Sequence, residues 1–155
     1  MKRILFALGI ILITLPLILV PASAAKPGPA TTITLLNPPA DGLLVLGVGE
    51  SYTFDILITS DEPFNSAIAK VDIYYPGKGV FWHAGSDIAK QATSATLHLT
   101  VIGKKSTADL AAVCDWPAEG ICWPAGTAPQ VIGGAARFQG GLISFEAFPF
   151  TIQVP

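Results

Sequence analysis

The amino-acid sequence predicts an all-β protein, an antiparallel β-sandwich of about seven or eight strands that follows a signal peptide. Apolar and polar residues alternate over most of the chain after residue 31, which is typical of strands with one buried face. Turn signals rich in Gly, Pro, Asn and Asp separate these segments. Only Asp109 to Val113 favours even a single helical turn. Many short strands without helices indicate a sandwich rather than an α/β fold.

The first 24 residues have the three parts of a secretory signal peptide. Lys2 and Arg3 provide the positive charge, Ile4 to Val20 is almost entirely apolar, and Ala22-Ser23-Ala24 matches the small residues of a cleavage site. The alternative is a retained membrane anchor, but about 17 apolar residues are at the lower limit for spanning a bilayer. We expect cleavage after about Ala24 and a mature protein in a periplasm or outside the cell, not inserted in the membrane.

The mature chain is expected to be mildly acidic and to consist of one domain. Lys2 and Arg3 leave with the signal peptide, so seven of the nine Lys and Arg remain against eleven Asp and Glu, a formal charge of −4. The mature chain has one adjacent basic pair, Lys104-Lys105, whereas binding to phosphate backbones needs clustered basic side chains. Nucleic acid is therefore excluded as a partner. We expect a short flexible leader at 25–31 and a sandwich at 32–155.

Alternation predicts the first strands in chain order, and a dense turn at 37–42 separates the first two. The expected segments are 32–35, 43–48, 51–60, 67–75, 80–82 and 93–102. The side chains expected to be buried in the three longest are Tyr52, Phe54, Ile56, Ile58, Ala69, Val71, Ile73, Tyr75, Ala95, Leu97, Leu99 and Val101. A weaker strand is expected at 131–139, because Gly133 and Gly134 interrupt its pattern.

The last strand is expected at 142–154, with an irregularity inside it. The side chains expected to face inward change parity along it, from Ile143 and Phe145 to Phe148, Phe150, Ile152 and Val154. A two-residue period cannot change parity without an extra residue, so we expect a β-bulge near Glu146-Ala147. Pro149 lacks an N–H and therefore indicates an edge strand or a bulge at that point.

The N-terminal part of this pattern resembles bacterial immunoglobulin-like domains. Pro39-Ala40-Asp41-Gly42 is similar to the turn that often opens those domains, and Gly49-Glu50-Ser51-Tyr52 is similar to their glycine-led second strand. The resemblance extends over 32–102 and 130–154, and it implies an immunoglobulin-like sandwich. The cysteine pair that joins the sheets of antibody domains is absent. Residues 106–130 have the length of an insertion.

Cys114 and Cys122 are expected to form a disulfide that closes a loop of nine residues. Closing such a loop contributes about 2.6 kcal/mol by the chain-entropy estimate. Trp116 lies within this loop and Trp123 directly follows it, and tryptophan is favoured at binding hot spots. They are therefore candidate ligand contacts. The alternative is that both rings pack over the open end of the sandwich. Trp82 is a third candidate, with the same alternative of packing.

The sequence favours neither catalysis nor metal binding. His83 and His98 are the two histidines, and a zinc site would need further ligands at regular spacing. A glycine-flanked nucleophile elbow is absent. Four acidic loop residues could be combined into a hydrolase pair, and three of them into a calcium site, but their spacing is that of ordinary solvated loops. The four residues are Asp61, Glu62, Asp87 and Asp115, and the calcium site would use only the first three of them. We expect no enzyme activity, cofactor or metal.

The leading hypothesis is an exported, non-enzymatic binding or adhesion module that contacts a protein or a surface component through the tryptophan-containing loop. A carbohydrate-binding domain, whose tryptophans stack on sugar rings, is a second hypothesis. A small hydrolase with loop carboxylates is a third. A structural subunit that associates through an exposed sheet edge is a fourth.

Overall fold

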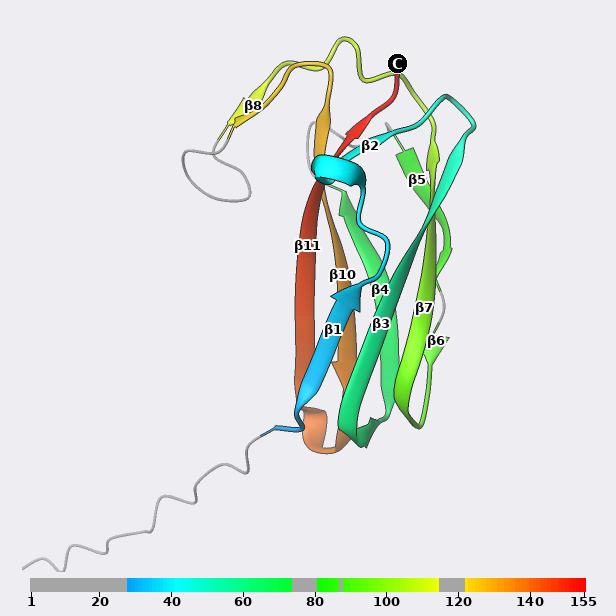
Figure 1. The fold of residues 1–155 in the computed structure, drawn as a ribbon, viewed down its shortest axis with the longest axis vertical. Helices are drawn as coiled ribbons and strands as arrows, with labels where there is room; N and C mark the ends of the chain where they lie inside the picture. Colours follow the sequence, from blue (N-terminus) through cyan, green and yellow to red (C-terminus); the bar gives the residue numbers. More distant parts are fainter. Residues whose placement is uncertain (1–27, 74–80, 87, 115–121) are drawn as a thin grey trace, which may run out of the picture.

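The structure is a computed structural model that describes residues 28–73, 81–86, 88–114 and 122–155 (Figure 1). Within these ranges it contains eleven strands and two short 3-10 helices. They are β1 (Thr31–Leu35), η1 (Ala40–Gly42), β2 (Leu43–Val45), β3 (Ser51–Phe64), β4 (Ser66–Ile73), β5 (Phe81–Ser86), β6 (Ile88–Ala89), β7 (Ala92–Gly103), β8 (Val113–Cys114), β9 (Cys122–Trp123), β10 (Ala128–Arg137), η2 (Gln139–Gly141) and β11 (Ile143–Gln153). None of the helices in the described ranges is long and apolar enough to cross a membrane.

Two sheets pack face to face (Figure 1). The first has the strand order β1-β3-β7-β5, and the second has the order β2-β11-β10-β4-β6. All neighbours in these two sheets are antiparallel except β2 and β11, which are parallel. The N-terminal segment therefore gives one strand to each sheet. This is the strand order of an immunoglobulin-like sandwich, so the predicted fold is confirmed.

The core lies between the sheets and contains the alternate residues of the long strands. β3 and β7 bury the residues expected from their sequence, with Ala95 and Tyr52 partly buried. The side chains of Ile73 and Tyr75 lie outside the described part. The rings of Phe54 and Phe150, with centroids 5.0 Å apart, join the two sheets. The largest fully buried apolar side chains are Phe54, Phe64, Ile56, Ile58, Leu97, Leu99, Ile132, Ile152, Val101 and Val154.

β10 is a central strand, so the prediction of a weak strand was wrong. It pairs with β11 along one side and with β4 along the other. Its two glycines mark places where no side chain fits. A Cβ atom on Gly134 would lie 2.7 Å from Cγ2 of Ile33 and 2.9 Å from Cγ2 of Ile56, and one on Gly133 would lie 2.7 Å from Cε2 of Phe145. The glycines allow a close approach rather than interrupting the strand.

β11 is regular, so the prediction of a bulge at Glu146-Ala147 was also wrong. Its register with β10 is continuous over the whole length of β10. Phe148 is half-buried and Phe150 is buried, and both face the other sheet. Ile143 and Phe145, which were expected to be buried, are on the outer face and are 59% and 60% exposed. The apparent change of parity arises because this strand has apolar residues on both faces.

Pro149 lies on an unpaired edge, as its missing N–H predicts. β2 pairs with β11 only at Thr151–Gln153. Among the described residues, no strand pairs with that side of β11 before Thr151. The proline ring therefore removes no hydrogen bond from the sheet.

Gly134→Ala should destabilise the protein more than Gly133→Ala. The new methyl group at 134 would meet two side chains held between the sheets, an overpacking that typically costs about 1–3 kcal/mol. At 133 it would meet the end of an exposed Phe145 ring, which can rotate away. Urea unfolding of both variants measures the difference, and equal losses would contradict the packing described.

Candidate functional site

The described part of the predicted stapled loop is a short hairpin. β8 and β9 pair antiparallel, with Val113 opposite Trp123 and Cys114 opposite Cys122. A disulfide joins Cys114 and Cys122, which confirms the predicted bond. The hairpin projects from one end of the sandwich and adds no strand to either main sheet (Figure 1).

Thr107 fixes the base of this projecting segment. It is completely buried, and its hydroxyl donates to the carbonyl oxygen of Gly126 at 2.6 Å. The same hydroxyl accepts the N–H of Val154 at 3.0 Å, and the Thr107 N–H donates to the Val154 carbonyl oxygen at 2.8 Å. One side chain thus ties the start of the segment to its end and to the last strand.

The chain between Thr107 and the hairpin forms a turn rather than the helical turn expected at Asp109–Val113. The Leu110 N–H donates to the Thr107 carbonyl oxygen at 2.9 Å, and the Gly126 N–H donates to the Leu110 carbonyl oxygen at 2.9 Å. The two ends of the segment are therefore bonded to each other before the hairpin begins.

The three candidate tryptophans do not form one described cluster. Trp123 is half-buried in β9, directly after the disulfide. Trp116 lies outside the described residues. Trp82 is in β5, and its side chain is outside the described part. β5 and the hairpin lie on opposite sides of the sandwich in Figure 1, so the fold does not bring Trp82 to the hairpin.

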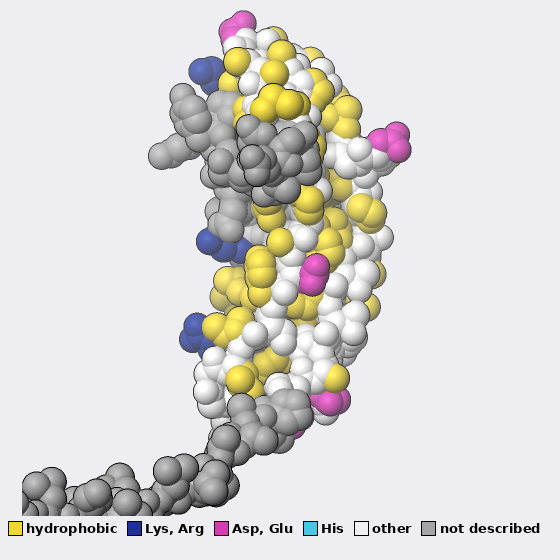
Figure 2. Space-filling view, turned by 90° about the vertical axis from the view of Figure 1, so that its left-hand side faces the viewer, with side chains coloured by type: hydrophobic (Ala, Val, Ile, Leu, Met, Phe, Trp, Pro, Cys, Tyr) yellow, Lys and Arg dark blue, Asp and Glu magenta, His cyan; other side chains and the backbone are white. Residues whose placement is uncertain are grey.

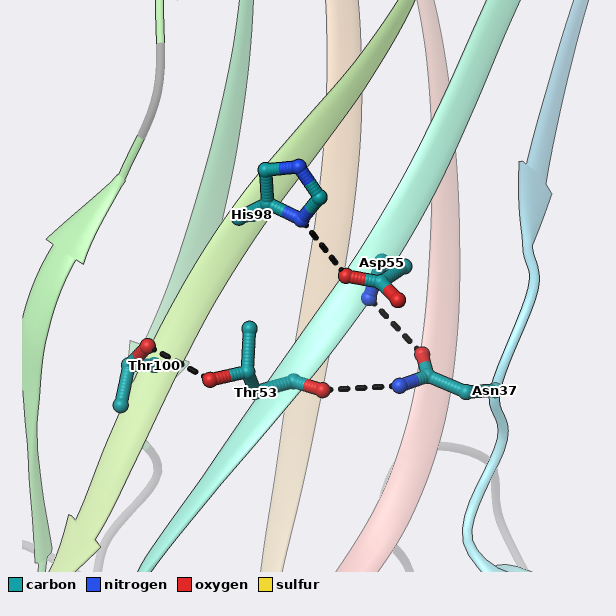
Figure 3. Close-up of polar contacts among 5 residues, drawn as sticks. All are labelled: Asn37, Thr53, Asp55, His98 and Thr100. Atoms are coloured by element: carbon teal, nitrogen blue, oxygen red, sulfur yellow. Dashed lines mark hydrogen bonds and ion pairs between the residues drawn. The ribbon is translucent and has the colours of Figure 1, made fainter.

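A group of polar side chains covers the outer face of the first sheet (Figure 3). His98 is on this exposed face and pairs with Asp55, with 2.7 Å between Nδ1 and Oδ1. Thr53 and Thr100 have their hydroxyl oxygens 2.8 Å apart. Both pairs are directly opposite in the register of β3 and β7. Because the Asp55 and His98 side chains are 36% and 54% exposed, their contact contributes only about 0–1 kcal/mol.

Asn37 extends this face where β1 has ended. Its Nδ2 donates to the Thr53 carbonyl oxygen at 2.8 Å, and its Oδ1 accepts the Asp55 N–H at 2.7 Å. The side chain thereby takes the place of a strand's backbone beside β3 (Figure 3). The described residues contain no cluster of His, Cys, Asp or Glu that could hold a metal ion. This face is best explained by cross-strand stabilisation.

Sequence reasoning missed an apolar groove between the edges of the two sheets. One wall comes from β1 and the other from β11, and the turn that carried the family resemblance closes one end. The groove has a volume of about 370 Å³ and is lined by Ile33, Thr34, Leu35, Pro38, Pro39, Gly42, Phe148, Pro149 and Phe150. The two adjacent prolines before η1 were the only local sign of this groove in the sequence. The β11 residues that form the opposite wall lie more than 100 residues away in the chain.

Thr107→Val should destabilise the protein by about 1–3 kcal/mol. The substitution keeps the shape of the side chain but leaves the partly buried Gly126 carbonyl oxygen and the buried Val154 N–H without this partner. Urea unfolding measures the loss. Thr96→Val, on the exposed face of β7, is the matched control and should change stability by less than about 0.5 kcal/mol. A loss no larger than that of the control would contradict the anchoring role.

Comparison with known proteins adds little to this description. No family model and no curated protein matches the chain. Among solved structures, it is similar to the BIgI domain of beta protein from S. agalactiae bound to CEACAM1, with 13% identity, a TM-score of 0.35, and 79% of this chain and 96% of that chain covered. A similarity at this level carries no argument about function. The immunoglobulin-like fold is shown by the strand order of the chain itself.

Proposed function

We propose that this protein is an exported, non-enzymatic binding or adhesion module that contacts a protein or a surface component through the disulfide-linked hairpin. The observation that carries the proposal is the way the hairpin is built. It contributes nothing to either main sheet, yet a buried hydrogen-bonding side chain holds its base and a disulfide closes its arms. With two residues in each strand, it would not be stable alone.

The hairpin has the physical properties of a contact surface. A loop that is already constrained loses less conformational entropy when it binds. Trp123 follows the disulfide directly and is only half-buried, so part of this large side chain faces solvent. Tryptophan is among the residues that contribute most to binding energy at interfaces. Trp116 is proposed as the second contact because it lies within the loop that the same disulfide closes.

Export is part of the proposal and rests on two features. Residues 1–24 have the composition of a signal peptide. The Cys114–Cys122 bond is of the kind that persists in oxidising compartments outside the cytoplasm. The corresponding organisation is a signal peptide at 1–24, a leader at 25–31, and a sandwich at 32–155 with the insertion at 106–130.

Trp116→Ala/Trp123→Ala should lower the affinity for the partner at least tenfold, as expected when a hot-spot pair is removed. The purified protein is screened against arrays of extracellular proteins and of glycans, and affinities are measured for each binder found. Binding that is confined to glycans would favour the carbohydrate-binding alternative.

Trp82→Phe is the control for this experiment, because β5 lies apart from the hairpin. It should retain wild-type affinity, and Cys114→Ser/Cys122→Ser should weaken binding because the loop is no longer constrained. Unchanged affinity in the Trp116→Ala/Trp123→Ala variant would remove the hairpin from the proposal.

A further inference from the structure

β11 has an open edge, defined here as the side of residues 143–149 that faces away from β10. Within the described part of the chain, β2 reaches only Thr151–Gln153 and no other strand pairs with this side of β11. In Figure 1, β11 forms the outer margin of its sheet. A row of unpaired backbone groups on an edge strand is a template for pairing with another chain.

The alternation of the strand shows which backbone groups lie on the open edge. The N–H of Leu46, directly after β2, donates to the carbonyl oxygen of Gln153 at 2.9 Å. The backbone groups of Gln153, an odd-numbered residue, therefore face away from β10. Because the pairing with β10 is unbroken, the N–H and C=O groups of Ile143, Phe145 and Ala147 face the same way. Pro149, without an N–H, ends the series.

The open edge is also apolar. Ile143 and Phe145 are largely exposed there, and the register places Phe145 in a row with Ala135, Ile68 and Ile88 across four strands. The space-filling view of this side shows hydrophobic side chains in a band along the molecule, with Lys and Arg side chains at one margin (Figure 2). Exposed apolar patches of this kind mark interaction surfaces.

We propose that β11 pairs antiparallel with β11 of a second copy of this chain, about a two-fold axis at Phe145. In this register Phe145 faces Phe145 of the second copy, Ile143 faces Ala147, and Ser144 faces Glu146. Aromatic and apolar cross-strand pairs are favourable, and serine can hydrogen-bond a carboxylate. Three pairs exchange backbone bonds, giving about six hydrogen bonds between the copies.

Charge disfavours one neighbouring register, the one with its two-fold axis at Glu146. If the axis passed through Glu146, the two carboxylates of the dimer would be directly opposite at the closest spacing in the ladder, which is destabilising. With the axis at Phe145, the Glu146 of each copy is opposite the uncharged Ser144 of the other copy. The edge is therefore self-complementary, as a two-fold interface requires.

The same register provides an occupant for the apolar groove. Leu142 of the second copy lies opposite Phe148, which lines the groove together with Ile33 and Leu35. Leu142 is 45% exposed, and its extended backbone (φ −62°, ψ 140°) continues the strand. Its parity directs the side chain to the inner side of the sheet, where the groove lies. The dimer buries two leucines that the single copy exposes.

Sedimentation equilibrium of the full exported protein tests the pairing. The interface is short, well below the roughly 1,600 Å² of a standard stable complex, so dimers should accumulate with concentration up to about 1 mM. Ala147→Pro removes an edge N–H and should raise the dimer dissociation constant at least tenfold, with thermal unfolding unchanged. Ala147→Ser keeps the N–H and is the matched control, which should still dimerise.

Cysteine cross-linking tests the register. Directly opposite Cα atoms in a hydrogen-bonded pair are about 5.5 Å apart, which suits a disulfide. Phe145→Cys should therefore form covalent dimers under oxidation, whereas Glu146→Cys, which faces Ser144, should not. The native cysteines are already bonded to each other. A wild-type protein that stays monomeric up to about 1 mM, or cross-linking favoured at 146, would overturn the proposal.

This pairing does not depend on the function of the hairpin. The Trp116→Ala/Trp123→Ala variant should dimerise with the wild-type dissociation constant, because neither residue lies on the open edge. Loss of dimerisation in that variant would show that the hairpin, and not β11, forms the contact between copies.

Discussion

The continuous pairing of β10 with β11 determines which side chains of these last two long strands lie in the core and which lie on the surface. Because Arg137 is opposite Ile143 and the pairing is unbroken, the face of the sheet to which each later side chain of β11 points is fixed. Phe150 and Ile152 are then directed into the core, and Ile143 and Phe145 are directed to solvent. The apolar outer face and the apolar groove are both consequences of this single register.

That register also requires close contact between the sheets. Gly134 allows β10 to approach Ile33 and Ile56, and Gly133 leaves space for the Phe145 ring on the opposite face. The two adjacent glycines of β10 therefore allow close packing on opposite faces of the sheet, Gly134 on the core face and Gly133 on the outer face. The hairpin of β8 and β9 lies outside the apolar core and is stabilised differently. Hydrogen bonds of the buried Thr107 fix its base, and a disulfide joins its two strands.

Sequence reasoning succeeded where one face of a strand is apolar and the other polar. In β3 and β7 the threonines, Asp55 and His98 identified the outer face, so the buried set could be read directly. It failed on β11, because apolar residues occupy both of its faces and periodicity cannot say which set is buried. It failed on β10 because the need for Gly134 comes from residues that are distant in sequence.

The candidate site was predictable to a similar extent. The disulfide could be predicted from the cysteine count and the expected signal peptide, because only one intramolecular pairing exists. The anchoring role of Thr107 and the strand-like role of Asn37 could not be predicted, because each depends on backbone groups brought near by the fold. Trp116 and Trp123 remain predicted contacts that binding measurements decide.

The division of the N-terminal segment between the two sheets has a mechanical consequence. β1 is bonded to β3 in the first sheet, and β2 runs parallel to the end of β11 in the second. Tension applied between the start of β1 and the end of β11 would load the β2–β11 bonds together, in shear, rather than opening them one after another. Because β1 is bonded along its length to β3, the same tension would also load the β1–β3 bonds in shear, so both sheets would carry the load from the start.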